Sequence, residues 1–353
     1  MGTVGNEQSS PNAISTTSGL QAVVAMVRVR WLRPVALYGF TLWAMLTINF
    51  LLPRAMPGDP LLALVDQESQ SFVRDENVRQ RLAQYYGLDQ PVWRQYLAYI
   101  GHLAHGDLGW SISQRAPVLK LISIHLPWTL LLMIPSVALS TALSLIAGVN
   151  AGWVRGSVLD RGLVSLFVIS STIPAFLIGL FLLLVFSVRF GWLPLAGAYT
   201  PFRLYHGVLD QFSDVLSHLT LPMVSLTLTM LGRDFLLARS SMITVLGEEF
   251  MLVARGKGLS ERALKYRHGL RNALLPVVTR FALQIGTAVT GVVLIESLFA
   301  YPGMGRLMFN AVTARDYPLI EGCFLIAGLA VLVANIVADM SYAWLDPRTR
   351  RDA

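Results

Sequence analysis

Six long apolar runs divide the chain, and shorter polar or charged segments separate them. The runs span 35–53, 126–154, 162–188, 215–232, 281–295 and 322–338. A helix needs about 20 mostly apolar residues to cross the hydrocarbon core of a bilayer. The first three runs carry no charged residue, and the charges that bound the other three lie at their ends, where the insertion penalty is small. The pattern therefore predicts an all-α polytopic membrane protein with six transmembrane helices.

Composition narrows the class of protein further. Of the 353 residues, 54% are hydrophobic and 14% are charged, and the mean hydropathy is +0.56. A soluble domain carries roughly 25% charged residues, and a disordered chain combines low hydrophobicity with high charge. Both classes are excluded. A disulfide-stapled secreted domain is excluded by the presence of a single cysteine, Cys323.

What the net charge of +7 indicates depends on where the basic residues lie along the chain. They lie between the apolar runs, so they indicate membrane topology and no nucleic-acid partner is expected. One side collects fifteen of them: Arg28, Arg30, Arg33, Arg155, Arg161, Arg239, Arg255, Lys257, Arg262, Lys265, Arg267, Arg271, Arg348, Arg350 and Arg351. The two shorter loops of the other side hold four, namely Arg189, Arg203, Arg306 and Arg315. Because basic loops stay inside, both termini are predicted to face the cytoplasm.

The segments outside the runs define the expected domains. Residues 1–33 are predicted to form a disordered cytoplasmic tail and a pre-membrane segment, since the first 20 residues are rich in Ser, Thr, Asn and Gly. No cleavable signal pattern is seen near the start, so the first run is expected to remain as a helix. Residues 34–353 then form one membrane domain. Its long first loop, 54–126, is predicted to be an extracytoplasmic subdomain.

The first loop has helical periodicity over roughly 75–105. Val78, Leu82 and Tyr85 share one helix face, and Pro91 can begin a second helix. Two interpretations stay open: the loop packs on the helix ends, or it contacts a partner or substrate on that face.

The loop 239–274, predicted to be cytoplasmic, has the pattern of a helix, a turn and a second helix. Glu249 lies in the first turn of a helical stretch and Arg255 and Lys257 lie at its end, so each charge complements the helix dipole. Gly258 is placed for the left-handed position that follows a helix.

The same stretch has an apolar face that needs a partner. Phe250, Val253 and Ala254 are spaced three and four apart. Ser260 can cap the second helix, which runs toward the fifth span. An exposed apolar face rimmed by charge is typical of a docking surface.

Polar residues inside the predicted spans are candidates for lining a passage. They are Ser171, Gln284, Thr287 and Glu296. Intramembrane polar residues usually face a bundle interior or a water-filled cavity. The alternative is structural, because Ser and Thr can bond their own helix backbone and small residues let helices pack closely. Pro174 lies inside the third run and can kink it.

Enzymatic signatures are missing from the sequence. The only Gly-Lys pair, Gly256–Lys257, lacks the upstream glycine of a phosphate-binding loop. His102, His105 and Asp107 are too loosely spaced to indicate a metal site, and no zinc-protease helix or serine-hydrolase elbow is present. We therefore expect no catalytic residue, no cofactor and no metal in this chain.

Several motifs occur in an order that resembles a known family. They are PGDP at 57–60, YGLDQPVWRQYLAYIGHLAHGDLGWSI at 86–112, IPAFLIGLFLLLVFSVRFGWLPLAG at 173–197, ARGKGLSERALKYRHGLRNALLPVV at 254–278, IESLFAYPGMGRL at 295–307, RDYP at 315–318 and LDPR at 345–348. Together they are similar to the permeases of binding-protein-dependent ABC importers, in the dipeptide, oligopeptide and nickel branch. The resemblance covers about 35–350.

The resemblance implies a type I importer permease fold and a division of labour. The chain would be one of two homologous permease subunits in a bacterial cytoplasmic membrane, served by two cytoplasmic ATP-binding subunits and an extracytoplasmic solute-binding protein. The short helix at 248–258 would be the coupling helix. Ala254, Gly258 and Leu259 match the signature positions, and Glu249, Arg255 and Lys257 would be its polar contacts with the ATPase. The Glu-Ala-Ala triplet of the general signature is replaced by LVA at 252–254.

The cargo implied by the resemblance is a peptide-like solute, moved across the lipid bilayer by alternating access. Within the same architecture a nickel chelate, glutathione or another non-peptide solute stays an alternative. A secondary transporter or channel would need acids at mid-membrane or broken helices for ion coupling, whereas the acids here cluster at the ends of the runs. A membrane enzyme is the third class considered.

Overall fold

The computed structural model describes residues 36–52, 54, 55, 80 and 89–345 of the chain, without the side chains of 282, 285–291 and 338–345. The predicted N-terminal tail, and the helical pattern at Val78, Leu82 and Tyr85, lie outside these residues. The chain divides into two units, Met1–Ile48 and Asn49–Ala353, and the second unit carries nearly all of the described structure.

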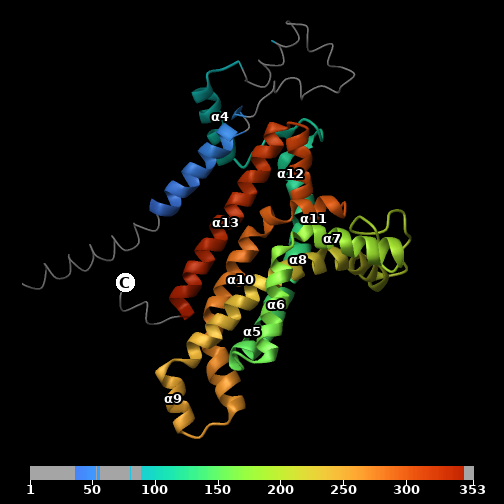
Figure 1. Ribbon diagram of the computed structural model, residues 1–353. Coiled ribbons are helices and arrows are strands. Elements are labelled where there is room, and N and C mark those ends of the chain that lie inside the picture. The colour runs from blue at the N-terminus through green and yellow to red at the C-terminus, as the bar shows by residue number, and fades with distance from the viewer. Residues whose placement is uncertain (1–35, 53, 56–79, 81–88, 346–353) are drawn as a thin grey trace, which may run out of the picture. The chain divides into compact units, whose positions relative to one another are not determined.

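The described residues are mostly helical (Figure 1). An apolar helix covers Ala36–Leu52. The further helices are α4 (Val92–Ala104), α5 (Val118–Trp153), α6 (Val158–Thr172), α7 (Ala175–Leu182), η3 (Leu183–Arg189), α8 (Val208–Leu246), α9 (Glu249–Gly256), η4 (Ala263–Leu270), α10 (Arg271–Gly291), α11 (Val293–Leu298), α12 (Met304–Thr313) and α13 (Tyr317–Leu345). Here η denotes a π-helix. Two short strands, β1 (Trp110–Ser111) and β2 (Ala116–Pro117), pair antiparallel.

Fewer membrane spans than the predicted six can be recognised among the described residues. Three helices are long and apolar enough: α5, α8 and the part of α13 from Tyr317 to Val337. A fourth arises only if α6 and the Ala175–Arg189 stretch count as one broken span. The apolar helix Ala36–Leu52 is shorter, and α10 is not among the candidates. The six-span prediction is therefore not confirmed by length and composition.

The third predicted run is not one straight helix. The helix axis bends by 95° between α6 and the Ala175–Arg189 stretch, and α7 turns away from α6 at this point (Figure 1). Ile173 is extended at φ −83°, ψ 125°, and Pro174 follows it. Proline has no N–H to donate and disfavours the helical conformation of the residue before it. The kink expected at Pro174 is therefore a full break in the run 162–188.

The fifth predicted run is also divided. α10 ends at Gly291, Val292 leaves the helical conformation at φ −108°, ψ 2°, and α11 begins at Val293. The residues around 281–295 therefore belong to two helices.

The most extensive helix contact joins α5 to α8. On α5 the small residues Ser136, Ser140, Ser144, Gly148 and Gly152 recur every four positions and all are buried. A four-residue spacing puts them on one face. A Cβ placed on Gly148 would lie 2.7 Å from the Cβ of Ala238 and 2.9 Å from the carbonyl oxygen of Phe235. Glycine is therefore required at position 148 by the closeness of the two helices.

This contact generates a test of stability. Gly148→Ala should lower the stability of the protein by roughly 1–3 kcal/mol, because the added methyl meets backbone that cannot easily move. Gly162→Ala on α6 is the matched control, since a Cβ there meets nothing within 4 Å and Ala favours a helix over Gly. The midpoint of thermal unfolding in detergent measures both. Equal midpoints for the two variants would contradict the proposed packing.

Candidate functional site

The short helix α9 lies within the predicted stretch 248–258 and is followed by Gly258, as the sequence predicted. It begins at Glu249 and ends at Gly256, and the next residue, Lys257, donates its N–H to Val253 O at 3.0 Å. Gly258 has φ +73°, and its N–H reaches Arg255 O at 2.9 Å. Only glycine adopts this left-handed conformation readily. The predicted stop at Gly258 is confirmed.

One face of α9 is buried within the chain itself. Met251 and Ala254, three residues apart, pack with Leu264 of η4, and Trp153 at the end of α5 lies against them. Met251 is 0% exposed and Ala254 is 6% exposed. Ala254, a signature position of the family resemblance, therefore faces the protein's own core. Its structural effect is to seat α9.

The opposite face of α9 is exposed and apolar. Leu252 and Val253 are 64% and 58% exposed, and Phe250 is 39% exposed. The predicted apolar face combined Phe250, Val253 and Ala254. The structure corrects it, because Ala254 points inward and Leu252 takes its place outside.

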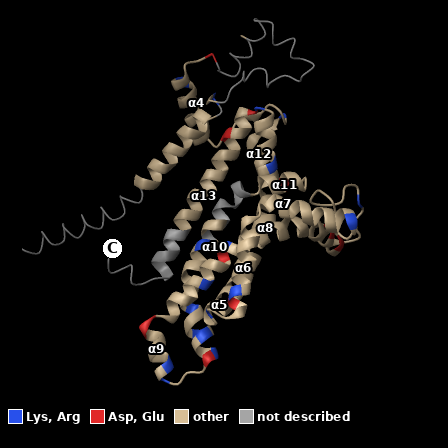
Figure 2. Ribbon diagram, in the orientation of Figure 1, with Lys and Arg blue, Asp and Glu red and all other residues tan. Residues whose placement is uncertain are grey.

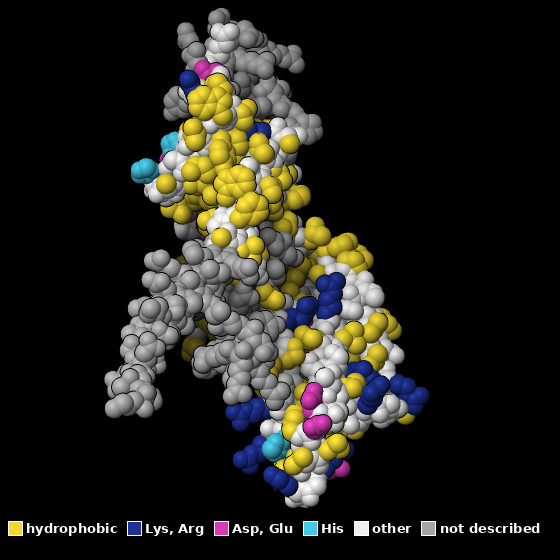
Figure 3. Space-filling view, turned by 90° about the vertical axis from the view of Figure 1, so that its left-hand side faces the viewer, with side chains coloured by type: hydrophobic (Ala, Val, Ile, Leu, Met, Phe, Trp, Pro, Cys, Tyr) yellow, Lys and Arg dark blue, Asp and Glu magenta, His cyan; other side chains and the backbone are white. Residues whose placement is uncertain are grey.

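Charged side chains surround this exposed face. Glu249, Arg255 and Lys257 are exposed, as are Gly258 and Leu259. Figure 2 shows Lys and Arg concentrated at the end of the bundle that carries α9, hereafter the α9 end. In Figure 3 hydrophobic and charged side chains alternate over the same region. The combination fits a protein docking surface.

The α9 end is held together by contacts between distant segments. Arg239 of α8 forms a bidentate ion pair with Asp160 of α6. Its Nε lies 2.6 Å from Oδ1 and its Nη2 lies 2.8 Å from Oδ2. Lys265 of η4 donates to Asn150 of α5. A Cβ on Gly269 of η4 would lie 2.6 Å from the terminal methyl of Met242. These contacts join η4 to α5 and α8, and α8 to α6, at the α9 end.

A buried carboxylate, Asp234, ties three helices together. It is 3% exposed and accepts hydrogen bonds from Ser140 Oγ on α5 at 2.9 Å, from Arg280 Nε at 2.8 Å and from Gln284 Nε2 at 2.9 Å, both on α10. A buried charge needs such partners. Asp234 lies just beyond the predicted run 215–232, and that position did not indicate this role. An acid beside an apolar run was the available signal.

The four residues predicted to line a passage lie in different surroundings. Gln284 donates to Asp234, and the Ser171 hydroxyl donates to Val168 O of its own helix at 2.8 Å. Ser171 also lies directly against Gly232 of α8, where a Cβ would overlap it. The side chain of Thr287 lies outside the described residues. Glu296 is 0% exposed and hydrogen-bonded to Thr129.

Two of the recognised motifs meet at Asp316. Its carboxylate accepts from Ser111 Oγ at 2.6 Å and from Ser113 N and Oγ at 2.8 and 2.7 Å, and it also caps α13 through Leu319 N at 3.2 Å. Ser111 belongs to the motif at 86–112 and Asp316 to RDYP. Residues about 200 positions apart therefore form one joint.

The first loop is anchored near α4, which follows Pro91 as predicted. Arg54 pairs with Glu321 of α13 at 2.6 Å, and Asn49 Nδ2 donates to Tyr99 OH at 3.1 Å. Burial raises the pKa of Tyr99 to about 12, and the hydrogen bond from Asn49 acts in the opposite direction. Tyr99 therefore stays protonated across the physiological range.

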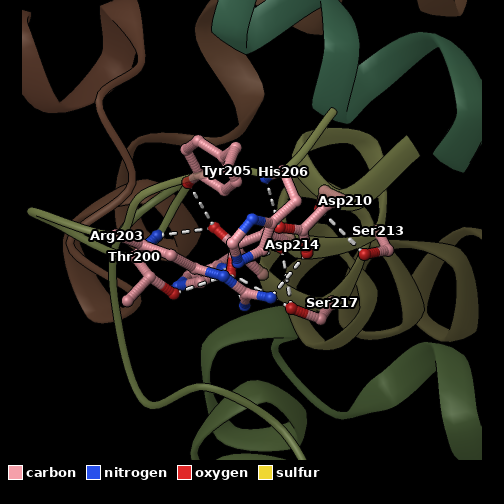
Figure 4. A network of polar contacts seen from close by, with 9 residues as sticks. Thr200, Arg203, Tyr205, His206, Asp210, Ser213, Asp214 and Ser217 are labelled. Carbon is pink, nitrogen blue, oxygen red and sulfur yellow. Dashed lines mark hydrogen bonds and ion pairs between the residues drawn. The ribbon is translucent and has the colours of Figure 1, made fainter. Parts of the chain in front are cut away.

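A second polar network shapes the start of α8 (Figure 4). The carboxylate of Asp214, which is 4% exposed, accepts from Thr200 N at 2.7 Å, Thr200 Oγ1 at 2.6 Å and Tyr205 OH at 2.9 Å. Arg203 bridges Asp214 and Asp210, at 3.2 and 2.6 Å. These groups bond one another and fold the segment before α8.

Within the described part of the chain, no group of three or more His, Cys, Asp or Glu side chains is placed to hold a metal. His102 contacts Asp107 at 3.2 Å, and both side chains are exposed.

Comparison with known proteins gives a consistent family. A family model described as "binding-protein-dependent transport system inner membrane component" matches residues 124–351. The di/tripeptide transport system permease protein DppB of Pseudomonas aeruginosa is 35% identical over 323 residues, covering 88% of this chain and 95% of that protein.

Other relatives carry different substrate names. The oligopeptide transport system permease protein AppB of Bacillus subtilis is 36% identical, covering 85% of this chain and 92% of its own. The glutathione transport system permease protein GsiC of Shigella flexneri is also 36% identical, covering 88% and 95%.

The seat of α9 can be tested separately from its exposed face. Met251→Ala should weaken α9 packing by roughly 2–4 kcal/mol, because it leaves a cavity at a fully buried position. Leu252→Ala, at an exposed position of the same helix, should change the packing little. The rate of proteolytic cleavage between residues 247 and 258 measures the difference. Equal rates would show that Met251 does not seat the helix.

The Asp234 joint predicts an effect on folding. Asp234→Ala removes the acceptor for three donors and leaves Arg280 without its carboxylate. We expect a loss of roughly 1–3 kcal/mol, reduced because Arg280 is partly exposed. The double variant Asp234→Ala, Arg280→Met should regain part of this loss, since no unpaired charge remains. Thermal unfolding midpoints measure it, and a double variant less stable than the single one would contradict the pairing.

Proposed function

Because the chain belongs to the family of binding-protein-dependent transport system inner membrane components, we propose that it is a membrane-spanning permease subunit of an ATP-driven importer of peptide-like solutes. The observation that carries the proposal is α9, a short helix seated by one face and exposed by the other, within the stretch that resembles the family's coupling loop.

The proposed coupling surface is the outer face of α9. Leu252, Val253 and Phe250 would enter a cleft of a cytoplasmic ATP-binding subunit, and Glu249, Arg255 and Lys257 would make polar contacts at its rim. Gly258 ends the helix, and Leu259 follows on the exposed side. Burial of aromatic and aliphatic side chains within a charged rim suits a docking interface.

The inner face of α9 would carry the mechanical part of coupling. Met251 and Ala254 pack against Leu264 and Trp153, so movement of the docked helix would displace η4 and α5. ATP binding and hydrolysis belong to two partner ATPases in this mechanism. The permease contributes the change between outward and inward access.

Membrane topology is part of the proposal. Six spans would comprise the Ala36–Leu52 helix, α5, the bent pair from α6 to η3, α8, α10 with α11, and α13. Both termini and the α9 end would face the cytoplasm of a bacterial cell. The concentration of Lys and Arg at the α9 end supports this orientation (Figure 2).

The cargo is proposed to be a di- or oligopeptide, supplied by an extracytoplasmic solute-binding protein and passed through a pathway shared with a second homologous permease. Two relatives are named for peptide transport and one for glutathione transport. A nickel chelate or glutathione is the alternative within the same architecture. Ser171, Gln284 and Thr287 stay candidates for lining the pathway.

Crosslinking and pull-down from native membranes test the proposed docking. The intact chain should bring down ATP-binding subunits, and Leu252→Asp with Val253→Asp should reduce their recovery at least about tenfold. A tenfold loss needs only about 1.4 kcal/mol, and placing two carboxylates in an apolar cleft costs more than that.

The matched control introduces the same charge elsewhere. Leu204→Asp alters an exposed apolar residue, 87% exposed, in the segment before α8, and should leave ATPase recovery at the level of the intact chain. If the intact chain recovers no ATP-binding subunit, the importer function is wrong. If all three forms recover it equally, α9 is not the docking helix.

A further inference from the structure

Glu296 of α11 is an acid enclosed by three separate segments. It is 0% exposed. Its Oε1 accepts from Thr129 Oγ1 of α5 at 2.6 Å, and its Oε2 accepts from the backbone N–H of Arg306 in α12 at 3.0 Å. Thr129 Oγ1 in turn accepts from Met304 N at 2.7 Å. One carboxylate and one hydroxyl thus join α5, α11 and the first turn of α12.

The glycines of the PGMG stretch make room for this carboxylate. A Cβ on Gly303 would overlap the carboxylate of Glu296. A Cβ on Gly305 would lie 2.9 Å from Glu296 Oε2 and 2.9 Å from the Cα of Val293. Gly303 has φ −90°, an ordinary value, so its requirement is one of space and not of backbone conformation. The contact between α11 and α12 therefore leaves no room for a side chain at position 303 or 305.

The N-terminus of α12 supplies backbone donors to the joint. The N-terminus of the ten-residue α12 presents unpaired N–H groups and the positive end of its dipole. Met304 and Arg306 each donate one of these N–H groups to the joint. The Arg306 guanidinium donates to Ala300 O at 2.6 Å, which closes the loop between α11 and α12.

Aromatic packing reinforces the same closure. Tyr301 is 0% exposed, and its N–H donates to Glu296 O at 2.8 Å. Its ring meets Trp128 edge-on at 6.0 Å, and Trp128 precedes Thr129 on α5. The loop is therefore attached to α5 both by the carboxylate and by an apolar contact.

α5 connects this joint with the seat of α9. It runs without interruption from Val118 to Trp153. Thr129 contacts Glu296, and Trp153 contacts the cluster of Met251, Ala254 and Leu264. Thr129 and Trp153 lie 24 positions apart, which is about 36 Å along a helix. One helix, which has Pro135 between these two residues, thus contacts both the seat of α9 and the joint at Glu296.

We propose that Glu296 is a positioning residue that locks the α11–α12 hairpin, Val293–Thr313, to α5, so that motion at the α9 seat is delivered to this hairpin at the far end of the transport path. The inference rests on the proposed function and adds to it the site at which α5 holds the α11–α12 hairpin. Glu296 was predicted to line a passage. In the lock its carboxylate is engaged by donors, and its role is mechanical.

Hydrogen exchange tests the lock without any transport assay. The amides of Met304 and Arg306 should exchange slowly in the intact permease. Glu296→Ala and Thr129→Val should each speed their exchange about tenfold or more, because each removes an acceptor. Asn310→Ala, on the exposed side of α12, is the matched control and should leave the exchange unchanged. If these amides exchange at the same rate in all four proteins, the lock does not exist.

The coupling ratio tests what the lock does. The permease is assembled with its partner subunits in liposomes, and dialanine imported per ATP hydrolysed is measured with dialanine-loaded binding protein. Glu296→Ala and Thr129→Val should each lower this ratio about tenfold, and their combination should lower it no further than the more severe single change. A smaller amount of folded complex would not alter a ratio.

Glu296→Gln keeps the shape of the side chain and one acceptor oxygen, so it should recover at least about a third of the ratio. Ratios for Glu296→Ala and Thr129→Val equal to that of Asn310→Ala would overturn the mechanical role. If the intact complex imports no dialanine while the exchange pattern holds, the proposed cargo fails and the lock stands. If the exchange pattern fails while import proceeds, only the lock is wrong.

Discussion

The close approach of α5 and α8 is the contact on which the other described contacts depend. Lipid tails are as apolar as leucine, so helices in a bilayer associate through tight packing and not through a hydrophobic driving force. Small residues recur every four positions on α5. They let the two helices come so close at Gly148 that a methyl group would not fit between them. At this separation Ser140 of α5 reaches Asp234 of α8, whose carboxylate also pairs with Arg280 of α10. Without it, the buried Asp234 would lose its donor on α5, Ser140.

Buried acids act as joints between helices in this fold. Asp160, Asp234, Glu296 and Asp316 are each at most 3% exposed, and each accepts hydrogen bonds from a different element. An unpaired charge in such surroundings would be strongly unfavourable, so each acid holds two or three segments at a defined position. The buried acids therefore mark the points where separate segments are joined.

In the proposed mechanism the two faces of α9 have different roles. Its inner face meets α5 and η4, and its outer face meets solvent in the isolated chain. Since α5 continues unbroken to the Thr129–Glu296 contact, the α9 seat and the α11–α12 hairpin are connected through one helix. At Pro174, by contrast, the helix is interrupted. The axis bends by 95° there, so α7 runs in a different direction from α6.

Local chemistry was sufficient to determine much of this protein from its sequence. Apolar runs predicted the helical class and located α5, α8 and α13, and the charges and glycine around 249–258 predicted α9 and the left-handed Gly258. The motifs indicated the family. Pro174 marked a possible kink, but only the tertiary structure decided how sharply the helix bends there. It also decided the division at Val292, which face of α9 is buried, and the partners of Asp234 and Glu296. Periodicity defines a face but not its neighbour: Met251 is buried by Leu264 and Trp153, and Glu296 bonds Thr129 from 167 residues away. Such contacts are selected by helix packing, which no short segment of sequence encodes.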